Sequence, residues 1–122
     1  MGKVRVLLAN KPRMLRELLR SLIQRQADME VMGEVLDPVE LLLAVDETQA
    51  DVVVVDLPES GEEPGICSHL LAEYPQLLVL ALSPGRDRAI LYRQSIIKEE
   101  LSKLSDDEIL EAIRKTEVHI TY

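Results

Sequence analysis

The stretch VVVVDLPESG, residues 52–61, decides the fold. Its four consecutive valines show no polar alternation, and such a run is typical of a strand buried on both faces in a parallel sheet covered by helices. Asp56 follows directly and marks the carboxyl end of this strand. In open α/β sheets, ligands and chemistry gather at that edge because loops and helix N-termini converge there with free backbone N–H groups. Asp56 is therefore the first candidate functional residue.

Apolar runs and amphipathic stretches alternate on both sides of the valines. The apolar runs, which predict strands, lie at 4–10, 29–37, 52–55 and 77–83. The stretches with helical spacing lie at 12–27, 38–48 and 66–74. Strands that alternate with helices in this way predict right-handed crossovers and a parallel sheet between two layers of helices.

The last third of the chain is less regular. A helix is predicted over 105–116, where Ser105 and Glu108 have the spacing of a capping box. Before that helix the apolar residues show no clean period, and we predict one strand near 89–93. Residues 118–122 alternate polar and apolar side chains, which suits a short edge strand or the beginning of a further domain.

Composition limits the classes of function. The chain has 122 residues, 47% hydrophobic and 30% charged, which fits a single domain over residues 1–122. Its formal net charge of −8 predicts repulsion from nucleic acid and from anionic membranes, so we expect direct binding of neither. Cys67 is the only cysteine, which excludes an internal disulfide. No apolar run approaches the roughly 20 residues of a membrane span, so a cytoplasmic location is expected.

The order, spacing and strand endings of these elements resemble the receiver domain of two-component response regulators, above all receivers that precede a helix-turn-helix output domain. The segments that carry the resemblance lie within residues 1–83 and 104–114 and are VRVLLAN, LRELLRSLIQ, MEVMGEVLD, ADVVVVDL, LLAEYPQLLVLALS and LSDDEILEAIR. The resemblance implies a flavodoxin-like α/β fold, a doubly wound parallel sheet of five strands with helices on both faces. Residues 84–104 are shorter than the matching receiver segment, so the fourth helix is predicted to be shortened or missing.

The resemblance also implies a reaction. In receivers a histidine kinase transfers a phosphoryl group to an aspartate at the end of the third strand, and an acidic pair after the first strand helps that aspartate to hold Mg²⁺. Asp56 stands at the phosphoacceptor position and Gly61 at that of a loop glycine. Asn10 and Lys11 stand where the family has its acidic pair. Ser83 stands where the family has a Ser or Thr that hydrogen-bonds the phosphoryl group.

The loss of the acidic pair changes the expected chemistry. Mg²⁺ requires several hard oxygen ligands, and Asp56 is the only carboxylate of the three that remains. A Lys11 ammonium in the same cleft would compete with the cation, because at ~4 Å it attracts a carboxylate by about 4 kcal/mol at an effective dielectric constant near 20. We therefore expect no cofactor and no stable Mg²⁺ binding. The family's lysine after the last strand has two candidates, Lys98 and Lys103, and neither is assigned.

Each site residue also has a purely structural interpretation. Asp56 is equally suited to capping a loop or pairing with Lys11, and Lys11 to lying in solvent. Ser83 precedes Pro-Gly, a common beginning of a turn. Cys67 and Tyr92 suit ordinary core packing.

Three functions remain open. A degenerate receiver, which is no enzyme and acts in signalling or transcriptional regulation through protein contacts, accounts best for the changes at the first loop and in 84–104. The second is a phosphorylatable receiver with Asp56 as phosphoacceptor. The third is a flavodoxin-like cofactor binder, although no glycine-rich phosphate loop follows the first strand. Expected partners are a histidine kinase or an output domain, and a second copy bound through 84–104, where Ile90, Tyr92 and Ile96 need covering if they lie at a sheet edge.

Overall fold

The computed structural model of this chain describes residues 2–93 and 98–115. Within that part, the strands are β1 (Val4–Leu8), β2 (Met29–Glu34), β3 (Val52–Asp56), β4 (Leu78–Leu82), β5 (Arg88–Tyr92) and β6 (Lys98–Ser102). The helices are α1 (Arg13–Gln24), α2 (Pro38–Thr48), α3 (Gly65–Glu73) and α4 (Asp106–Arg114). None of these helices is long and apolar enough to cross a membrane.

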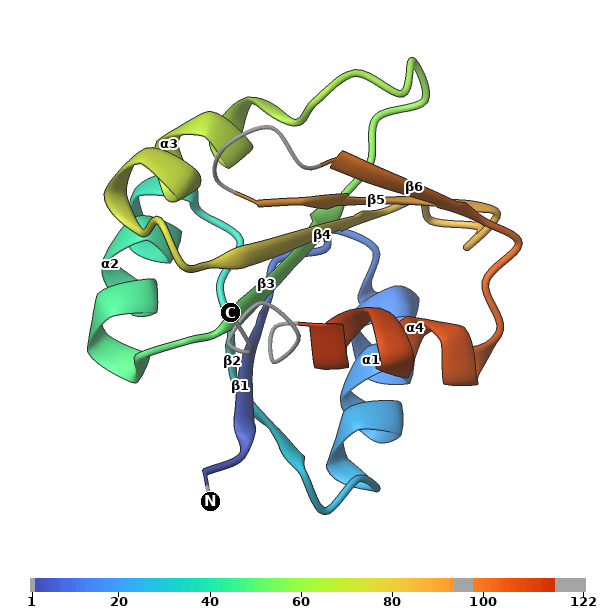
Figure 1. The fold of residues 1–122 in the computed structure, drawn as a ribbon, viewed down its shortest axis with the longest axis horizontal. Coiled ribbons are helices and arrows are strands. Elements are labelled where there is room, and N and C mark those ends of the chain that lie inside the picture. Colours follow the sequence, from blue (N-terminus) through green and yellow to red (C-terminus); the bar gives the residue numbers. More distant parts are fainter. Residues whose placement is uncertain (1, 94–97, 116–122) are drawn as a thin grey trace.

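The strands form one sheet in the order β2-β1-β3-β4-β5-β6, and its first four members are parallel. Every residue of β4 is buried, as is the valine run of β3, because both strands lie inside the sheet with helices over their two faces. Figure 1 shows α1 and α4 together on one side of the sheet and α2 and α3 on the other. The predicted flavodoxin-like α/β architecture is confirmed.

Each helical layer closes its own half of the core. The layer of α1 and α4 buries apolar side chains that share one helical stripe in each helix, and they are Leu15, Leu19, Leu22, Ile23, Ile109, Leu110, Ala112 and Ile113. The layer of α2 and α3 buries Leu41, Val45, Cys67 and Leu70. Burial of one such aliphatic side chain contributes about 1.5–3 kcal/mol. The alternation of residues along β3 divides its valines between the two halves.

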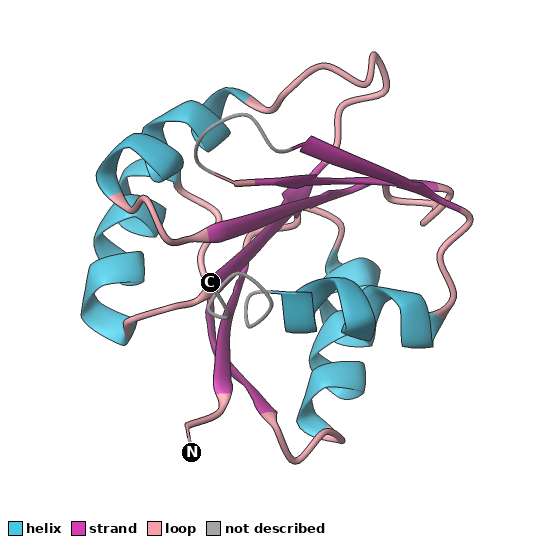
Figure 2. Ribbon diagram, in the orientation of Figure 1, coloured by secondary structure: helices cyan, strands magenta, loops and turns pink. Residues whose placement is uncertain are grey.

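The segment after β4 departs from the expected parallel arrangement. The sequence predicts five parallel strands, but the described residues form a sheet of six, and β5 is antiparallel to both β4 and β6. Residues 83–87 form a tight turn, in which the Ser83 N–H donates to Arg88 O at 3.0 Å and the Arg86 N–H to Ser83 O at 2.9 Å. A parallel crossover needs about a dozen residues or more, so this turn reverses the chain. In the described part of 84–104 no helix follows β4, in line with the predicted shortening or loss of the fourth helix, and β5 and β6 occupy this part of the sequence (Figure 2).

The predicted strand near 89–93 is β5, and it is an interior strand. Because β6 lies outside it, Ile90 and Tyr92 are buried and need no second copy of the chain to cover them. Burial raises the pKa of Tyr92 to about 12, and burial likewise raises the pKa of the Cys67 thiol to about 12. Both residues pack in the same half of the core. Ile96 and the residues 118–122 lie outside the described residues.

The predicted helix over 105–116 is confirmed as α4. Ser105 Oγ accepts a hydrogen bond from the Glu108 N–H at 3.2 Å, and Glu108 Oε1 accepts one from the Ser105 N–H at 2.9 Å. This capping box explains why the helix begins at Asp106. At its other end Arg114 donates to Asp28 at 2.8 Å, which ties α4 to the residues that precede β2.

Candidate functional site

Asp56 ends β3 at the carboxyl edge of the sheet, and both oxygens of its carboxylate accept hydrogen bonds from the loop after β1. Asn10 Nδ2 donates to Oδ1 at 3.1 Å, and the Lys11 backbone N–H donates to Oδ2 at 2.8 Å. The two segments meet because β1 and β3 are neighbouring parallel strands and so end at the same edge. The half-buried Asp56 therefore holds the β1–α1 loop from the side of β3.

Of the two alternatives for Lys11, an ion pair with Asp56 or a solvated side chain, the structure does not form the ion pair. Lys11 reaches Asp56 through its backbone, and no Lys11–Asp56 ion pair is found among the side chains that the structure describes. The Ala9 N–H donates to Val54 O at 2.8 Å, so the chain still follows β3 as it leaves β1 and turns the next amides toward Asp56. The Lys11 residue is exposed, which agrees with the alternative of a solvated loop lysine.

Asn10 is fully buried, which is unusual for a polar side chain. Its carboxamide is oriented by Asp56, since an ionised carboxylate only accepts hydrogen bonds and must face the NH₂ group. The other end, Oδ1, is buried without a hydrogen-bond partner among the described residues. An unsatisfied buried acceptor costs about 1–3 kcal/mol. Asn10 thus places a neutral donor beside Asp56, where a second carboxylate would repel it.

Arg16 of α1 holds the same loop from the other side, a role that no motif in the sequence indicates. Its Nη1 donates to Asn10 O at 2.9 Å and to Lys11 O at 2.8 Å, while its Nε donates to Glu34 Oε1 at 2.8 Å. Arg20 donates to the other oxygen of Glu34 at 2.8 Å. The hydrogen bond from Arg16, and then that from Arg20, lowers the pKa of the Glu34 carboxyl below its usual 4.5. The positively charged guanidinium of Arg16 therefore lies against the two loop carbonyls.

Ser83 lies at the same sheet edge, one residue after Leu82, which pairs with Asp56. Its Oγ donates to Asp87 Oδ1 at 2.6 Å and accepts from the Arg88 N–H at 3.0 Å. The bond from Ser83 is the main cause of the lowered pKa of Asp87. These contacts agree with the turn interpretation, because the hydroxyl is occupied in closing the β4–β5 turn.

Arg88 is a cation at this edge that the sequence did not reveal. Because β5 is antiparallel, its first residue lies beside the carboxyl ends of its neighbours, and Leu82 pairs with Ala89. Arg88 is thus two strands from Asp56, roughly 10 Å at about 4.8 Å per strand. Its guanidinium packs on Gly61, where an added β-carbon would lie 2.8 Å from Nη2. Among the described residues this guanidinium makes no hydrogen bond or ion pair.

The two lysine candidates lie elsewhere. Lys103 follows β6 at the same edge but one strand farther from Asp56 than Arg88 is, and it is exposed. Lys98 begins β6 and pairs with Tyr92, so it lies at the opposite edge of the sheet. Arg88, two strands from β3, lies where the last residue of a fifth parallel strand would lie.

No protein-family model and no curated protein matches this sequence. Solved structures do match. A two-component response regulator of the LuxR family from Aurantimonas sp. SI85-9A1 superposes with a TM-score of 0.55 at 26% identity, over 67% of this chain and 59% of that one. The response regulator domain of Thermotoga maritima CheB superposes with a TM-score of 0.63 at 20% identity, over 93% of this chain and 96% of that domain.

The chain has the fold of a response-regulator receiver domain. It spans less than two thirds of the LuxR-family regulator that it matches. The predicted receiver fold is therefore confirmed.

The donor groups of this receiver-like site are a poor match for Mg²⁺. The ion prefers octahedral oxygen ligands, commonly one or two carboxylates with water. At the end of β3 both oxygens of the Asp56 carboxylate already accept hydrogen bonds, and Asn10 presents an NH₂ group to it. The neighbouring loop carbonyls bind the Arg16 guanidinium. In residues 2–93 and 98–115 no three His, Cys, Asp or Glu side chains gather closely enough to hold a metal ion.

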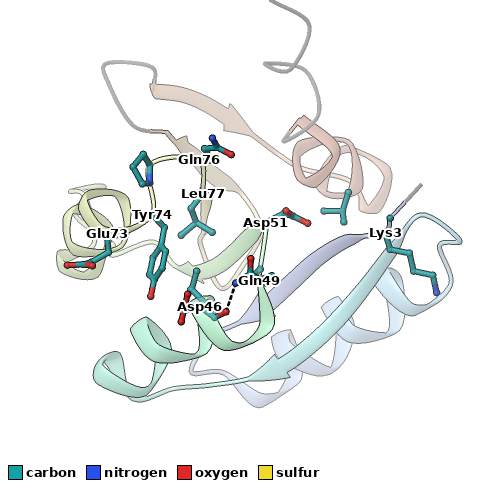
Figure 3. Close-up of a pocket in the computed structure, with 13 residues that line it drawn as sticks. Lys3, Asp46, Gln49, Asp51, Glu73, Tyr74, Gln76 and Leu77 are labelled. Carbon is teal, nitrogen blue, oxygen red and sulfur yellow. Dashed lines mark hydrogen bonds between the residues drawn. The ribbon is translucent and has the colours of Figure 1, made fainter.

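A separate hollow of about 620 Å³ lies at the opposite, amino-terminal edge of the receiver fold (Figure 3). Three of its polar lining residues make hydrogen bonds that hold the fold together. Tyr74 Oη donates to Leu42 O at 2.6 Å, and Asp51 Oδ2 accepts the Arg5 N–H at 2.9 Å. Gln49 Nε2 donates to Asp46 O at 2.7 Å, as drawn in Figure 3. These contacts join the segments around the hollow, so the three side chains have a structural role there.

Proposed function

We propose that this chain is a degenerate receiver domain that acts in signal transduction or transcriptional regulation through protein–protein contacts, without Mg²⁺-dependent phosphorylation of Asp56. The receiver fold supports a signalling role, and the two matched structures are both response regulators. The observation that carries the proposal is the state of Asp56, whose two carboxylate oxygens accept hydrogen bonds from Asn10 and Lys11.

The contacts of Asp56 oppose phosphoryl transfer in two ways. Transfer depends on positive charge that neutralises the phosphoryl oxygens, most often from a metal ion. The amide of Asn10 offers no charge, and Arg16 directs its guanidinium to loop carbonyls and Glu34. In addition, Ser83 must give up its bond to Asp87 before it can donate to a phosphoryl group, because a hydroxyl has one hydrogen.

A phosphorylatable receiver remains the second candidate, and Arg88 favours it. Arg88 and Lys11 both lie at the edge of Asp56, and neither side chain forms an ion pair among the described residues. Two such cations supply positive charge in place of a metal, although as separate side chains they do not template in-line geometry as a metal does. The remote alternative, a flavodoxin-like cofactor binder, gains no supporting observation.

A histidine kinase or an output domain is the expected protein partner. The predicted homodimer through 84–104 stays a prediction with a different physical basis, because Ile90 and Tyr92 are covered within the chain. A dimer through this region would need β6, which is the outermost strand of the sheet at that side.

Mass spectrometry after incubation with acetyl phosphate tests the proposal. Wild type is expected to gain no phosphoryl group, with or without millimolar Mg²⁺, and the Asp56→Asn variant provides the blank. The double variant Asn10→Asp, Lys11→Asp restores the acidic pair and is expected to gain one phosphoryl group only when Mg²⁺ is present. Uptake by wild type that Asp56→Asn abolishes would instead establish the second candidate.

A further inference from the structure

Exposed apolar side chains concentrate around the beginning of α2. Among the described residues, four large hydrophobic side chains are exposed: Met14 at 83%, Leu36 at 47%, Val39 at 65% and Leu43 at 61%. Three of the four fall within eight residues of sequence. We call Leu36, Val39 and Leu43 the α2 patch.

The α2 helix is apolar on two sides, although only one side faces the core. Leu41 and Val45 are buried against the sheet. Val39 and Leu43, four residues apart, lie one turn from each other on the outward side. A surface helix ordinarily carries polar residues there. Figure 1 shows α2 at the periphery of the molecule beside α3, with nothing from the described chain over its outer side.

The charged residues of the segment that carries the α2 patch are all of one sign. Residues 35–48 contain no Lys, Arg or His. Their four carboxylates, Asp37, Glu40, Asp46 and Glu47, are all exposed. A second copy docked through the same patch would bring these carboxylates together, and an anionic membrane would be repelled in the same way. The patch therefore fits apolar side chains that are flanked by positive charge.

We propose that the α2 patch docks a protein partner through an amphipathic helix whose apolar residues are flanked by lysines or arginines. Val39 and Leu43 are about 6 Å apart along the helix, at 1.5 Å per residue, and apolar residues four apart on a partner helix match that interval. The carboxylates around the patch then face the partner's cations, which favours encounter and orientation. The inference rests on the proposed function, since it names a surface for the protein contacts through which that function would act.

Two synthetic helical peptides of equal length test this docking mode. One places Leu at i, i+3, i+4 and i+7 with Lys at the other positions, and the second replaces every Lys with Glu. Fluorescence anisotropy of the labelled peptides against the whole chain should show saturable binding of the Lys peptide only. Leu43→Ala keeps a good helix former and should weaken binding about tenfold, roughly 1.4 kcal/mol of lost apolar contact.

The decisive variant is Val39→Asp. Its added negative charge should strengthen general attraction of the Lys peptide, whereas its loss of apolar surface should weaken docking on the α2 patch. Docking on the α2 patch predicts binding at least tenfold weaker, whereas general attraction between a cationic peptide and an acidic chain predicts tighter binding. Met14→Asp makes a matched change on α1 and should not weaken binding. The absence of saturable binding, tighter binding by Val39→Asp, or an equal loss with Met14→Asp would overturn the proposal. Self-association that Val39→Asp removes would identify a second copy as the occupant and overturn it as well.

A negative result in the peptide-binding experiment can be distinguished from a negative result for the proposed function. Asp56→Asn leaves the α2 patch intact, so it should bind the Lys peptide as wild type does. Acetyl phosphate uptake reports on Asp56 and peptide binding reports on the α2 patch, so each experiment can fail without the other. Thermal midpoints of all variants, measured by circular dichroism, show that each remains folded.

Discussion

The four parallel strands and the antiparallel β5–β6 pair both place polar side chains at the same edge of the sheet, but they do so in different ways. In the parallel part, β3 and β4 are interior strands whose carboxyl ends place Asp56 and Ser83 at one edge. In the antiparallel part, the reversal of β5 brings Arg88, the first residue of its strand, to that same edge. The interior strands β4 and β5, one from each part, both bury their apolar residues. The comparison teaches that the chemistry of a sheet edge depends on strand direction, which a strand prediction alone does not supply.

The sharpest way to break the comparison is to create cavities in each part. Leu80 of β4 and Leu91 of β5 pair across the two parts, and both are buried in the same core half. Leu80→Ala and Leu91→Ala should each lower the free energy of unfolding by about 2–5 kcal/mol. Urea denaturation measures both, with the exposed Met14→Ala as a control that should change little. A Leu91→Ala cost below about 1 kcal/mol beside a full Leu80→Ala cost would mean that β5 is not an integral strand.

Gly61 connects the two parts, since it lies in the loop after β3 and contacts Arg88 of β5. Its φ of +78° is unfavourable for any residue with a β-carbon. Gly61→Ala should therefore cost about 1–2 kcal/mol of stability. Because the Arg88 guanidinium is the end of a flexible side chain, the same cost should remain in an Arg88→Ala background, as measured by urea denaturation. If the cost vanishes there, the contact with Arg88 and not the backbone conformation is the cause.

Ser83→Ala tests whether the hydroxyl belongs to the turn. Loss of the bonds to Asp87 and to the Arg88 N–H should lower the free energy of unfolding by about 1 kcal/mol. Ser105→Ala, which removes the N-cap of α4, should cost about the same and serves as the reference. A neutral result for Ser83→Ala in thermal denaturation would favour a role at Asp56 over a role in the turn.

The smallest expected effect is a pH dependence of stability, which arises from Glu34 of β2 in the parallel part. The hydrogen bond from Arg16 lowers the pKa of Glu34 in the folded chain below the ordinary 4.5, so the unfolded chain binds the proton more readily. This contribution to stability is complete above pH 4.5 and is lost as the pH falls through the lower, folded pKa. Glu34→Gln should therefore destabilise at pH 7 and make little difference near pH 3, in paired thermal scans. An equal loss at both values would contradict the assignment.

The sequence predicts the parallel part well because each element there has a local signal. The valine run ends at Asp56 as predicted, and α4 begins after the Ser105 capping box, while β1 and β4 end at Leu8 and Leu82, slightly before the predicted ends at Asn10 and Ser83. The direction of β5 was not predictable, because Pro-Gly after Ser83 indicates a turn without giving the path of the chain beyond it. Lys11 contacts Asp56 through its backbone amide and not through its side-chain ammonium. This could not be predicted, because it depends on the backbone geometry of the loop. The Arg16 bonds to the first loop depend on how α1 packs.

We propose that two residues of the first loop, Asn10 and Lys11, and not the fold, remove the metal site. A thermal scan of wild type and of the Asn10→Asp, Lys11→Asp double variant across millimolar Mg²⁺ tests it directly. Three carboxylates in one cleft should destabilise the metal-free double variant, and Mg²⁺ at 100 times its dissociation constant should restore about 2.7 kcal/mol. The account predicts that the midpoint of the double variant rises with Mg²⁺ while that of wild type stays constant. A wild-type midpoint that rises as much as that of the double variant would contradict it.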